Sequence, residues 1–199
     1  MITLGLTGAI AAGKSEVARL LAARGAFLVD ADRVAQETYA PGGPAYDAVV
    51  RAFGPEVVAP DGAIDRRRLG ALVFADAARL KQLTDIVWPP TTESLAAIIR
   101  RQAEAGTRVL VLEAAVLLQA GWDRLVDEVW LVRAPLAAAR QRLQRSRGLT
   151  PDEVEARLGA AAAPDPARAH VGIDNDAGLA DLEAKVDAAW AALLKRAKL

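Results

Sequence analysis

Residues 8–15 read Gly8-Ala9-Ile10-Ala11-Ala12-Gly13-Lys14-Ser15, which fits the spacing G-x-x-x-x-G-K-[ST]. A loop of this kind wraps backbone N–H groups around phosphate oxygens, and its glycines allow a close approach that a side chain would block. The helix that follows directs its N-terminus at the same anion. The flanking sequence agrees, because an apolar run at 2–7 precedes the loop and an amphipathic run at 15–23 follows it. We therefore predict a strand, a phosphate-binding loop and a helix.

Two side chains at the end of this loop carry the chemistry. In such loops the lysine reaches the β- and γ-phosphates of a nucleotide and the hydroxyl binds Mg²⁺. The sequence thus predicts ATP and Mg²⁺ as cofactors, with Lys14 as a catalytic residue and Ser15 as a metal ligand. The predicted ATP-binding residues are Gly8, Ala9, Ile10, Ala11, Ala12, Gly13, Lys14, Ser15 and the following Glu16.

Composition narrows the class of protein. The chain has 199 residues, of which 53% are hydrophobic, enough for one α/β domain with a sizeable core. Lys plus Arg and Asp plus Glu both number 25, so no net positive charge is available to hold nucleic acid. There is no cysteine, which excludes disulfides and thiolate metal sites, and His170 is the only histidine. Because the sequence has no basic leader and no long apolar run, we expect a soluble, cytoplasmic protein. We also expect its substrate to be a small molecule.

Further apolar runs predict the rest of the sheet. They lie at 27–29, 109–112 and 129–132, with a weaker one at 170–173, and amphipathic segments separate them. Nearly continuous apolar strands that alternate with helices are typical of a parallel sheet covered on both faces. The sequence predicts a doubly wound α/β fold of five parallel strands.

Two helical segments interrupt this alternation. We predict a single domain over 1–199, with a core at about 1–40, 107–135 and 164–199. A helical substrate-binding insertion is expected at about 41–106, with helices near 45–53, 67–74, 77–86 and 91–105. A second helical segment at about 136–163 is the predicted lid. Trp88 and Pro89 fall between the last two helices of the insertion.

Two carboxylates close the second predicted strand, in Asp30-Ala31-Asp32. Side chains at the carboxyl end of a parallel strand face the ligand crevice of such sheets. In phosphoryl transfer to a hydroxyl, a carboxylate there can take or orient the hydroxyl proton. Asp32 is our predicted catalytic and substrate-binding residue. The alternative is a helix cap, because Asp32 precedes a helical pattern at 33–38.

Other candidates also have two interpretations. Glu113 ends the third predicted strand, where it is either a Mg²⁺ ligand or a plain strand-end carboxylate. Arg142, Arg145 and Arg147 crowd the helix after the fourth strand. They either reach the transferring phosphoryl group from a lid or form a solvated helix face. Within the insertion Arg66, Trp88 and Pro89 are predicted to bind substrate, although Trp88 can equally fill a core.

The chain resembles the dephospho-coenzyme A kinase family over nearly its whole length, and especially the kinase domain of the eukaryotic bifunctional coenzyme A synthase. The matching stretches are Gly5–Ser15, Gly25–Asp32, Ala40–Tyr46, Asp61–Arg66, Leu83–Pro89 and Glu113–Trp122. The resemblance implies transfer of the γ-phosphoryl group of ATP to the ribose 3′-hydroxyl of dephospho-coenzyme A. It also implies that Asp32 is the catalytic base, the second aspartate of the family's D-x-D.

The sequence departs from the family pattern at several of these positions. Ala11-Ala12 stands where the family often has Gly-Ser, and Glu113 replaces an aspartate. In the lid, Ser146-Arg147-Gly148-Leu149 replaces Arg-Asp-Gly-Leu, so that Arg145 or Arg147 would act as the lid arginine. Two alternatives stay open: another small-molecule kinase of the nucleoside monophosphate or shikimate type, and a nucleotide-binding homologue without turnover.

Overall fold

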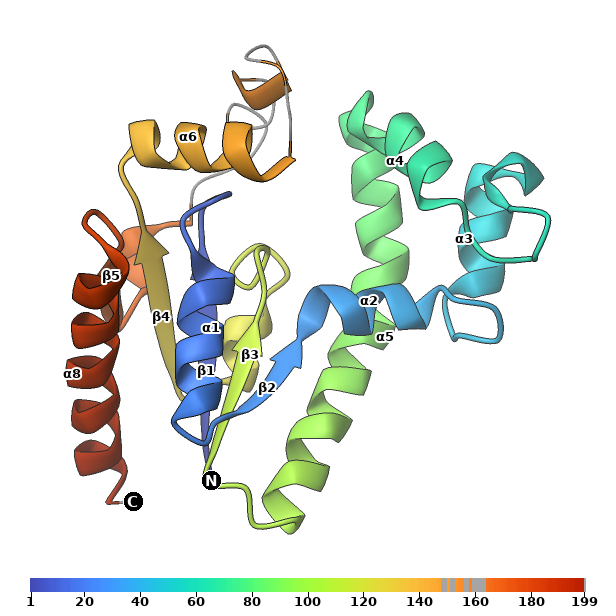
Figure 1. Ribbon diagram of the computed structural model, residues 1–199. Helices are drawn as coiled ribbons and strands as arrows, with labels where there is room; N and C mark the ends of the chain where they lie inside the picture. Colours follow the sequence, from blue (N-terminus) through green and yellow to red (C-terminus); the bar gives the residue numbers. More distant parts are fainter. Residues whose placement is uncertain (148–149, 151–152, 156–157, 159–163, 199) are drawn as a thin grey trace. The chain divides into compact units, whose positions relative to one another are not determined.

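The computed structural model describes residues 1–147, 150, 153–155, 158 and 164–198, and the side chains of residues 146 and 147 lie outside the description. The chain forms two compact units. One unit comprises Met1–Asp30 and Arg101–Leu199, and the other comprises Ala31–Arg100. All five strands of the sheet belong to the first unit, and the second unit is mostly helical (Figure 1). The helical unit thus begins directly after the second strand, before the boundary near residue 41 that the sequence indicated.

The first unit contains a five-stranded parallel sheet, as predicted, and its strand order is β2-β3-β1-β4-β5. The strands are β1 (Ile2–Gly8), β2 (Phe27–Asp30), β3 (Val109–Glu113), β4 (Glu128–Arg133) and β5 (Val171–Asp174). The helices of this unit are α1 (Lys14–Ala23), α6 (Leu136–Arg147) and α8 (Leu179–Ala197), with short 3₁₀ turns at η2 (Trp122–Leu125) and η3 (Pro166–Arg168). Because the strand order reverses beside β1, the loop after β1 lies at the switch point where ligands bind in such sheets.

One face of the sheet is buried under α1 and α8 (Figure 1). Leu4 and Leu6 of β1 are fully buried there, together with Trp130 and Val132 of β4. Each buried leucine contributes about 1.5–3 kcal/mol relative to an exposed one. On the other face a Cβ at Gly5 would lie 2.7 Å from a methyl group of Leu117. Both faces of the central strand are therefore packed, which fixes the position of the loop that follows it.

The second unit contains α2 (Ala31–Thr38), α3 (Tyr46–Phe53), η1 (Pro55–Val57), α4 (Arg66–Phe74) and most of α5 (Ala77–Glu104). Its own core combines Val49 and Phe53 of α3, Leu69 and Val73 of α4, and Val87 of α5. Asp65 caps α4, because its side chain accepts hydrogen bonds from the N–H groups of Arg67 and Arg68. This unit thus has a core of its own.

One predicted boundary is wrong. The sequence indicated two helices on either side of Trp88-Pro89, whereas α5 continues from Ala77 to Glu104 with Pro89 and Pro90 inside it. A proline removes one helical hydrogen bond and usually breaks the helix. Here one buried stripe, Val87, Thr91 and Leu95, runs past the proline pair at a helical spacing. The Thr91 hydroxyl also donates to the Val87 carbonyl at 2.7 Å. Packing on a continuous face therefore outweighs the local preference for a break.

Candidate active site

The backbone from Gly8 to Lys14 makes a tight turn between β1 and α1. A Cβ at Gly8 would lie 2.4 Å from the carbonyl oxygen of Val132, so glycine is needed there for the close approach to β4. Gly13 has a φ of 99°, which favours glycine, and is the N-cap residue of α1. Because Gly13 has no side chain, none of its atoms competes with an anion for the N-terminal N–H groups of α1. The local structure is that of a phosphate-binding loop.

Ala11 is the strained position of this loop. Its φ is 57°, in the left-handed region that residues with a Cβ rarely adopt. The conformation costs about 1–2 kcal/mol for an L-residue other than glycine. Strain of this size persists only where the surrounding structure enforces it, and it clusters at functional sites. The loop is therefore held in its shape by contacts outside it.

The predicted phosphate and metal residues meet at the carboxyl edge of the sheet. The Lys14 ammonium donates to the Gly8 carbonyl at 3.2 Å, which places the cation on its own loop. The Ser15 hydroxyl donates to Oε1 of Glu113 at 3.2 Å. The sequence could not show that Ser15 and Glu113 touch, because they are 98 residues apart.

Register adds a further carboxylate to this edge. Asp30 at the end of β2 is the register partner of Glu113 at the end of β3, and neighbouring strands lie about 4.8 Å apart. A hydroxyl and carboxylates are the oxygen donors that Mg²⁺ prefers. Among the described residues no group of three His, Cys, Asp or Glu forms a ready metal cage. The donors fit a Mg²⁺ ion that keeps waters and substrate phosphates as its other ligands.

The arginines of α6 whose side chains are described, Arg140, Arg142 and Arg145, do not converge on one point. Arg142 is half-buried, and its guanidinium donates to the carbonyls of Ala11 and Ala12, each at 3.2 Å. Arg145 is exposed, and Arg140 pairs with Glu155. The side chain of Arg147 lies outside the described residues, as does much of 148–163, the later part of the lid that we predicted at about 136–163. Binding of ATP by these arginines stays a prediction.

Sequence reasoning missed Asn175. This residue follows β5, and its side chain contacts the phosphate-binding loop by donating to the Ala12 carbonyl at 2.9 Å. The one available signal was its position, since a polar residue directly after a parallel strand lies at the ligand edge of the sheet. Glu16, by contrast, pairs with Arg19 on the flank of α1 at 2.6 Å. The hydrogen bond from Arg19 lowers the pKa of the Glu16 carboxyl.

The remaining predicted residues belong to the helical unit. Asp32 is the second residue of α2, which begins at Ala31, so the interpretation of Asp32 as a helix cap is wrong. Arg66 begins α4 and donates a hydrogen bond to Tyr39. Burial raises the pKa of the Tyr39 phenol, and Arg66 offsets part of that rise. Trp88 is half-buried and Pro89 exposed, both in the middle of α5.

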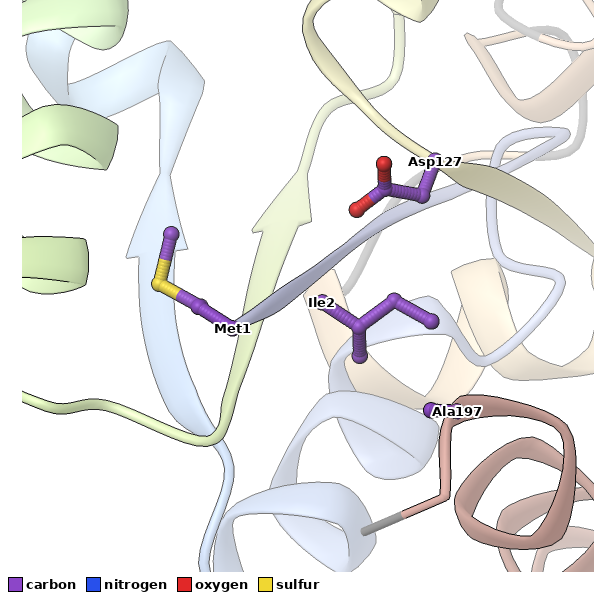
Figure 2. Close-up of a pocket in the computed structure, with 4 residues that line it drawn as sticks. All are labelled: Met1, Ile2, Asp127 and Ala197. Carbon is purple, nitrogen blue, oxygen red and sulfur yellow. The ribbon is translucent and has the colours of Figure 1, made fainter.

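A hollow of about 310 Å³ lies at the opposite end of the sheet (Figure 2). Its lining residues are Met1, Ile2, Asp127 and Ala197. Ile2 begins β1, whereas the phosphate-binding loop follows the last residue of that strand, Gly8. The hollow is therefore not part of the site described above.

One further residue serves the structure. His170 accepts a hydrogen bond from the Val129 N–H through Nδ1 at 2.9 Å. This bond ties the start of β5 to β4.

Across the described residues, no helix has the length and apolar character needed to span a membrane.

Comparison with known proteins identifies the family. The family model described as dephospho-CoA kinase matches residues 2–181. This chain belongs to that family. A dephospho-CoA kinase of Streptomyces avermitilis is 44% identical over 99% of this chain and 96% of the relative. One of Symbiobacterium thermophilum is 41% identical over 96% of this chain and 81% of the relative.

The fold comparison agrees. A crystal structure from Thermus thermophilus superposes with a TM-score of 0.78 at 34% identity, and covers 96% of this chain and 97% of its own. The predicted α/β class and the family resemblance are thereby confirmed. The relatives named here are bacterial, and the finer likeness to the eukaryotic kinase domain stays a prediction.

The strain at Ala11 gives a test of the loop. Ala11→Gly removes the left-handed penalty and adds the smaller backbone entropy cost of glycine. We expect the free energy of unfolding to rise by about 0.5–1 kcal/mol, or about 1–4 °C in Tm. Ala12→Gly is the matched control. Ala12 is 1% exposed and has no positive φ, so the same change there should lower the Tm. A lower Tm for Ala11→Gly in calorimetry would contradict the strain assignment.

Proposed function

We propose that this protein transfers the γ-phosphoryl group of ATP to the ribose 3′-hydroxyl of dephospho-coenzyme A, giving coenzyme A and ADP. The observation that carries the proposal is the phosphate-binding loop with Lys14 and the Ser15–Glu113 contact at its end, in a chain of this family. The loop, the lysine and the hydroxyl that phosphoryl transfer needs are all present in this chain.

The reaction assigns a task to each group. The hydroxyl oxygen of the acceptor forms a bond to the γ-phosphorus while the bond from that phosphorus to the β–γ bridging oxygen breaks, and ADP leaves. Lys14 and the N–H groups of the loop stabilise the charge on the phosphoryl oxygens. Ser15 and Glu113 supply oxygen donors for Mg²⁺, which would neutralise charge on the β- and γ-phosphates. The acceptor proton moves to a carboxylate, for which we propose Asp32.

The helical unit offers features that suit the acceptor. Arg66, Arg67 and Arg68 occupy the first turn of α4, the positive end of the helix dipole. The Asp65 carboxylate, which caps α4 and pairs with Arg68, already places one anion at that end, and a bound phosphate would be a second favourable anion there. The substrate carries a pyrophosphate, which Arg66 would bind, and Trp88 offers an aromatic face beside exposed Pro89.

The expected cytoplasmic location and the absence of nucleic-acid partners stay predictions.

The first test measures ADP release with a panel of acceptors: dephospho-coenzyme A, nucleoside monophosphates and shikimate. We expect turnover with dephospho-coenzyme A alone. Lys14→Ala should lower kcat by at least about 10²-fold, because it removes the one side-chain cation of the phosphate loop. Lys195→Ala, at an exposed position of α8, is the control and should leave kcat unchanged. Turnover with another acceptor only, or full activity of Lys14→Ala, would contradict the proposal.

The second test concerns the base. Asp32→Asn keeps the side-chain shape but cannot accept the proton, so kcat should fall by about 10²–10⁴-fold. The affinity for ATP should be preserved because the loop is unaltered. Asp47→Asn is a matched control, since Asp47 is likewise the second residue of its helix, α3, and exposed. If Asp32→Asn retains full activity, the base must be sought at Asp30 or Glu113.

The third test concerns the metal. Glu113→Gln keeps a hydrogen-bond acceptor for the Ser15 hydroxyl but removes a negative charge next to it. Residues that support a metal site in this way typically contribute 10–100-fold to metal affinity. We expect the Mg²⁺ concentration at half-maximal rate to rise by about tenfold or more, and saturating Mg²⁺ to restore part of the rate. Glu104→Gln, at an exposed position of α5, should leave the Mg²⁺ requirement unchanged. An unchanged requirement in Glu113→Gln would remove Glu113 from the metal site.

A further inference from the structure

Two side chains from segments far apart in the sequence meet at the carbonyl groups of the phosphate-binding loop. Nη2 of Arg142 donates to Oδ1 of Asn175 at 2.9 Å and to the Asn175 carbonyl at 3.2 Å. Nη1 of the same guanidinium donates to the carbonyls of Ala11 and Ala12. Nδ2 of Asn175 donates to the Ala12 carbonyl at 2.9 Å. We call these two side chains, with their bonds to the loop, the Arg142–Asn175 clamp.

The clamp is built into the core of the first unit. Asn175 is only 7% exposed, and its N–H donates to the Arg133 carbonyl at 2.7 Å, which anchors it to the end of β4. A buried amide is costly unless it is hydrogen-bonded. Only one orientation of the amide serves both partners, because Arg142 needs an acceptor and the Ala12 carbonyl needs a donor. The side chain of Asn175 is therefore fixed in place.

Gly13 makes room for this arrangement. A Cβ at Gly13 would lie 2.2 Å from Nδ2 of Asn175. The second glycine of the loop is thus required by the clamp as well as by its φ of 99°. Loop and clamp fit each other closely, so that displacement of either would disturb the other.

The clamp acts on the carbonyl side of the loop. In a trans peptide the C=O and N–H groups point in opposite directions. Fixing the Ala12 carbonyl against Arg142 and Asn175 therefore also fixes the direction of the Gly13 N–H, away from the clamp. Arg142 holds the carbonyl of Ala11 as well, the residue in the strained left-handed conformation. The contacts that enforce this strain include the guanidinium of Arg142.

We propose that Arg142 and Asn175 are positioning residues, which hold the phosphate-binding loop in the conformation that binds the phosphates of ATP. The proposal rests on the proposed function for its kinetic consequences, but its binding consequences do not depend on turnover. The competing account is that both side chains contact the nucleoside part of ATP directly. The two accounts differ for a ligand that has phosphates and no nucleoside.

The experiment compares ADP with inorganic tripolyphosphate as ligands in titration calorimetry. The variants are Asn175→Ala, which changes no charge, and Arg142→Lys, which keeps the charge but cannot bridge both carbonyls and Asn175. Because each variant loses buried hydrogen bonds, we expect its affinities for ADP and for tripolyphosphate to fall by about tenfold. The factor should be the same for the two ligands. Gln141→Ala, an exposed neighbour on α6, is the control and should bind both ligands like the wild type.

Kinetics give a second readout that a general loss of stability would not produce. In both variants kcat/KM for ATP should fall by about tenfold or more, while KM for dephospho-coenzyme A should change less than about twofold. A variant that loses affinity for ADP but not for tripolyphosphate would overturn the proposal in favour of direct nucleoside contact. Unchanged affinity for both ligands in the folded Arg142→Lys variant would overturn it outright. A wild type that binds both ligands but does not phosphorylate dephospho-coenzyme A would leave the clamp intact and contradict only the proposed function.

Discussion

The backbone turn from Gly8 to Lys14 is the constraint on which the site depends. It requires a left-handed residue at Ala11 and a glycine at Gly13, so the loop does not keep this shape by local preference alone. Its ends are fixed by β1, which is packed on both faces, and by α1, which is buried against the sheet. Its carbonyls are held from behind by Arg142 and Asn175. The sheet therefore supplies the support that a strained loop needs.

The same sheet explains why the other reactive groups are close to the loop. Parallel strands end at one edge, so the residues that close β2 and β3 lie at the same edge of the sheet as the residues that follow β1. Register makes Asp30 and Glu113 neighbours, and the first turn of α1 brings Ser15 to Glu113. A hydroxyl, carboxylates and a lysine on a phosphate loop are the groups that phosphoryl transfer uses. The fold thus brings these groups together at one edge of the sheet, and the side chains at the strand ends supply the reactive groups for phosphoryl transfer.

Much of this could be predicted from the sequence, for reasons that are local. The five strands are short apolar runs, and the phosphate loop has a fixed spacing of Gly8, Gly13, Lys14 and Ser15. Contacts between residues far apart in the sequence were harder to predict. The position of Asn175 after a strand indicates the ligand edge of the sheet, but not that Asn175 touches Ala12, 163 residues away. Pro89 and Pro90 predicted a break in α5, because the buried stripe that carries the helix past them depends on tertiary packing. The helix predicted at 33–38 was expected to start two residues too late, since α2 begins at Ala31, directly where β2 ends, and contains Asp32 in its first turn.

The position of the new phosphate on the product tests the central claim most directly. The purified protein would be incubated with ATP, Mg²⁺ and dephospho-coenzyme A, and the product examined by phosphorus and proton magnetic resonance. Our account predicts a new phosphomonoester whose phosphorus couples to the ribose H3′ proton, together with an equal amount of ADP. A phosphate at any other position, or ADP formed without a phosphorylated acceptor, would contradict it.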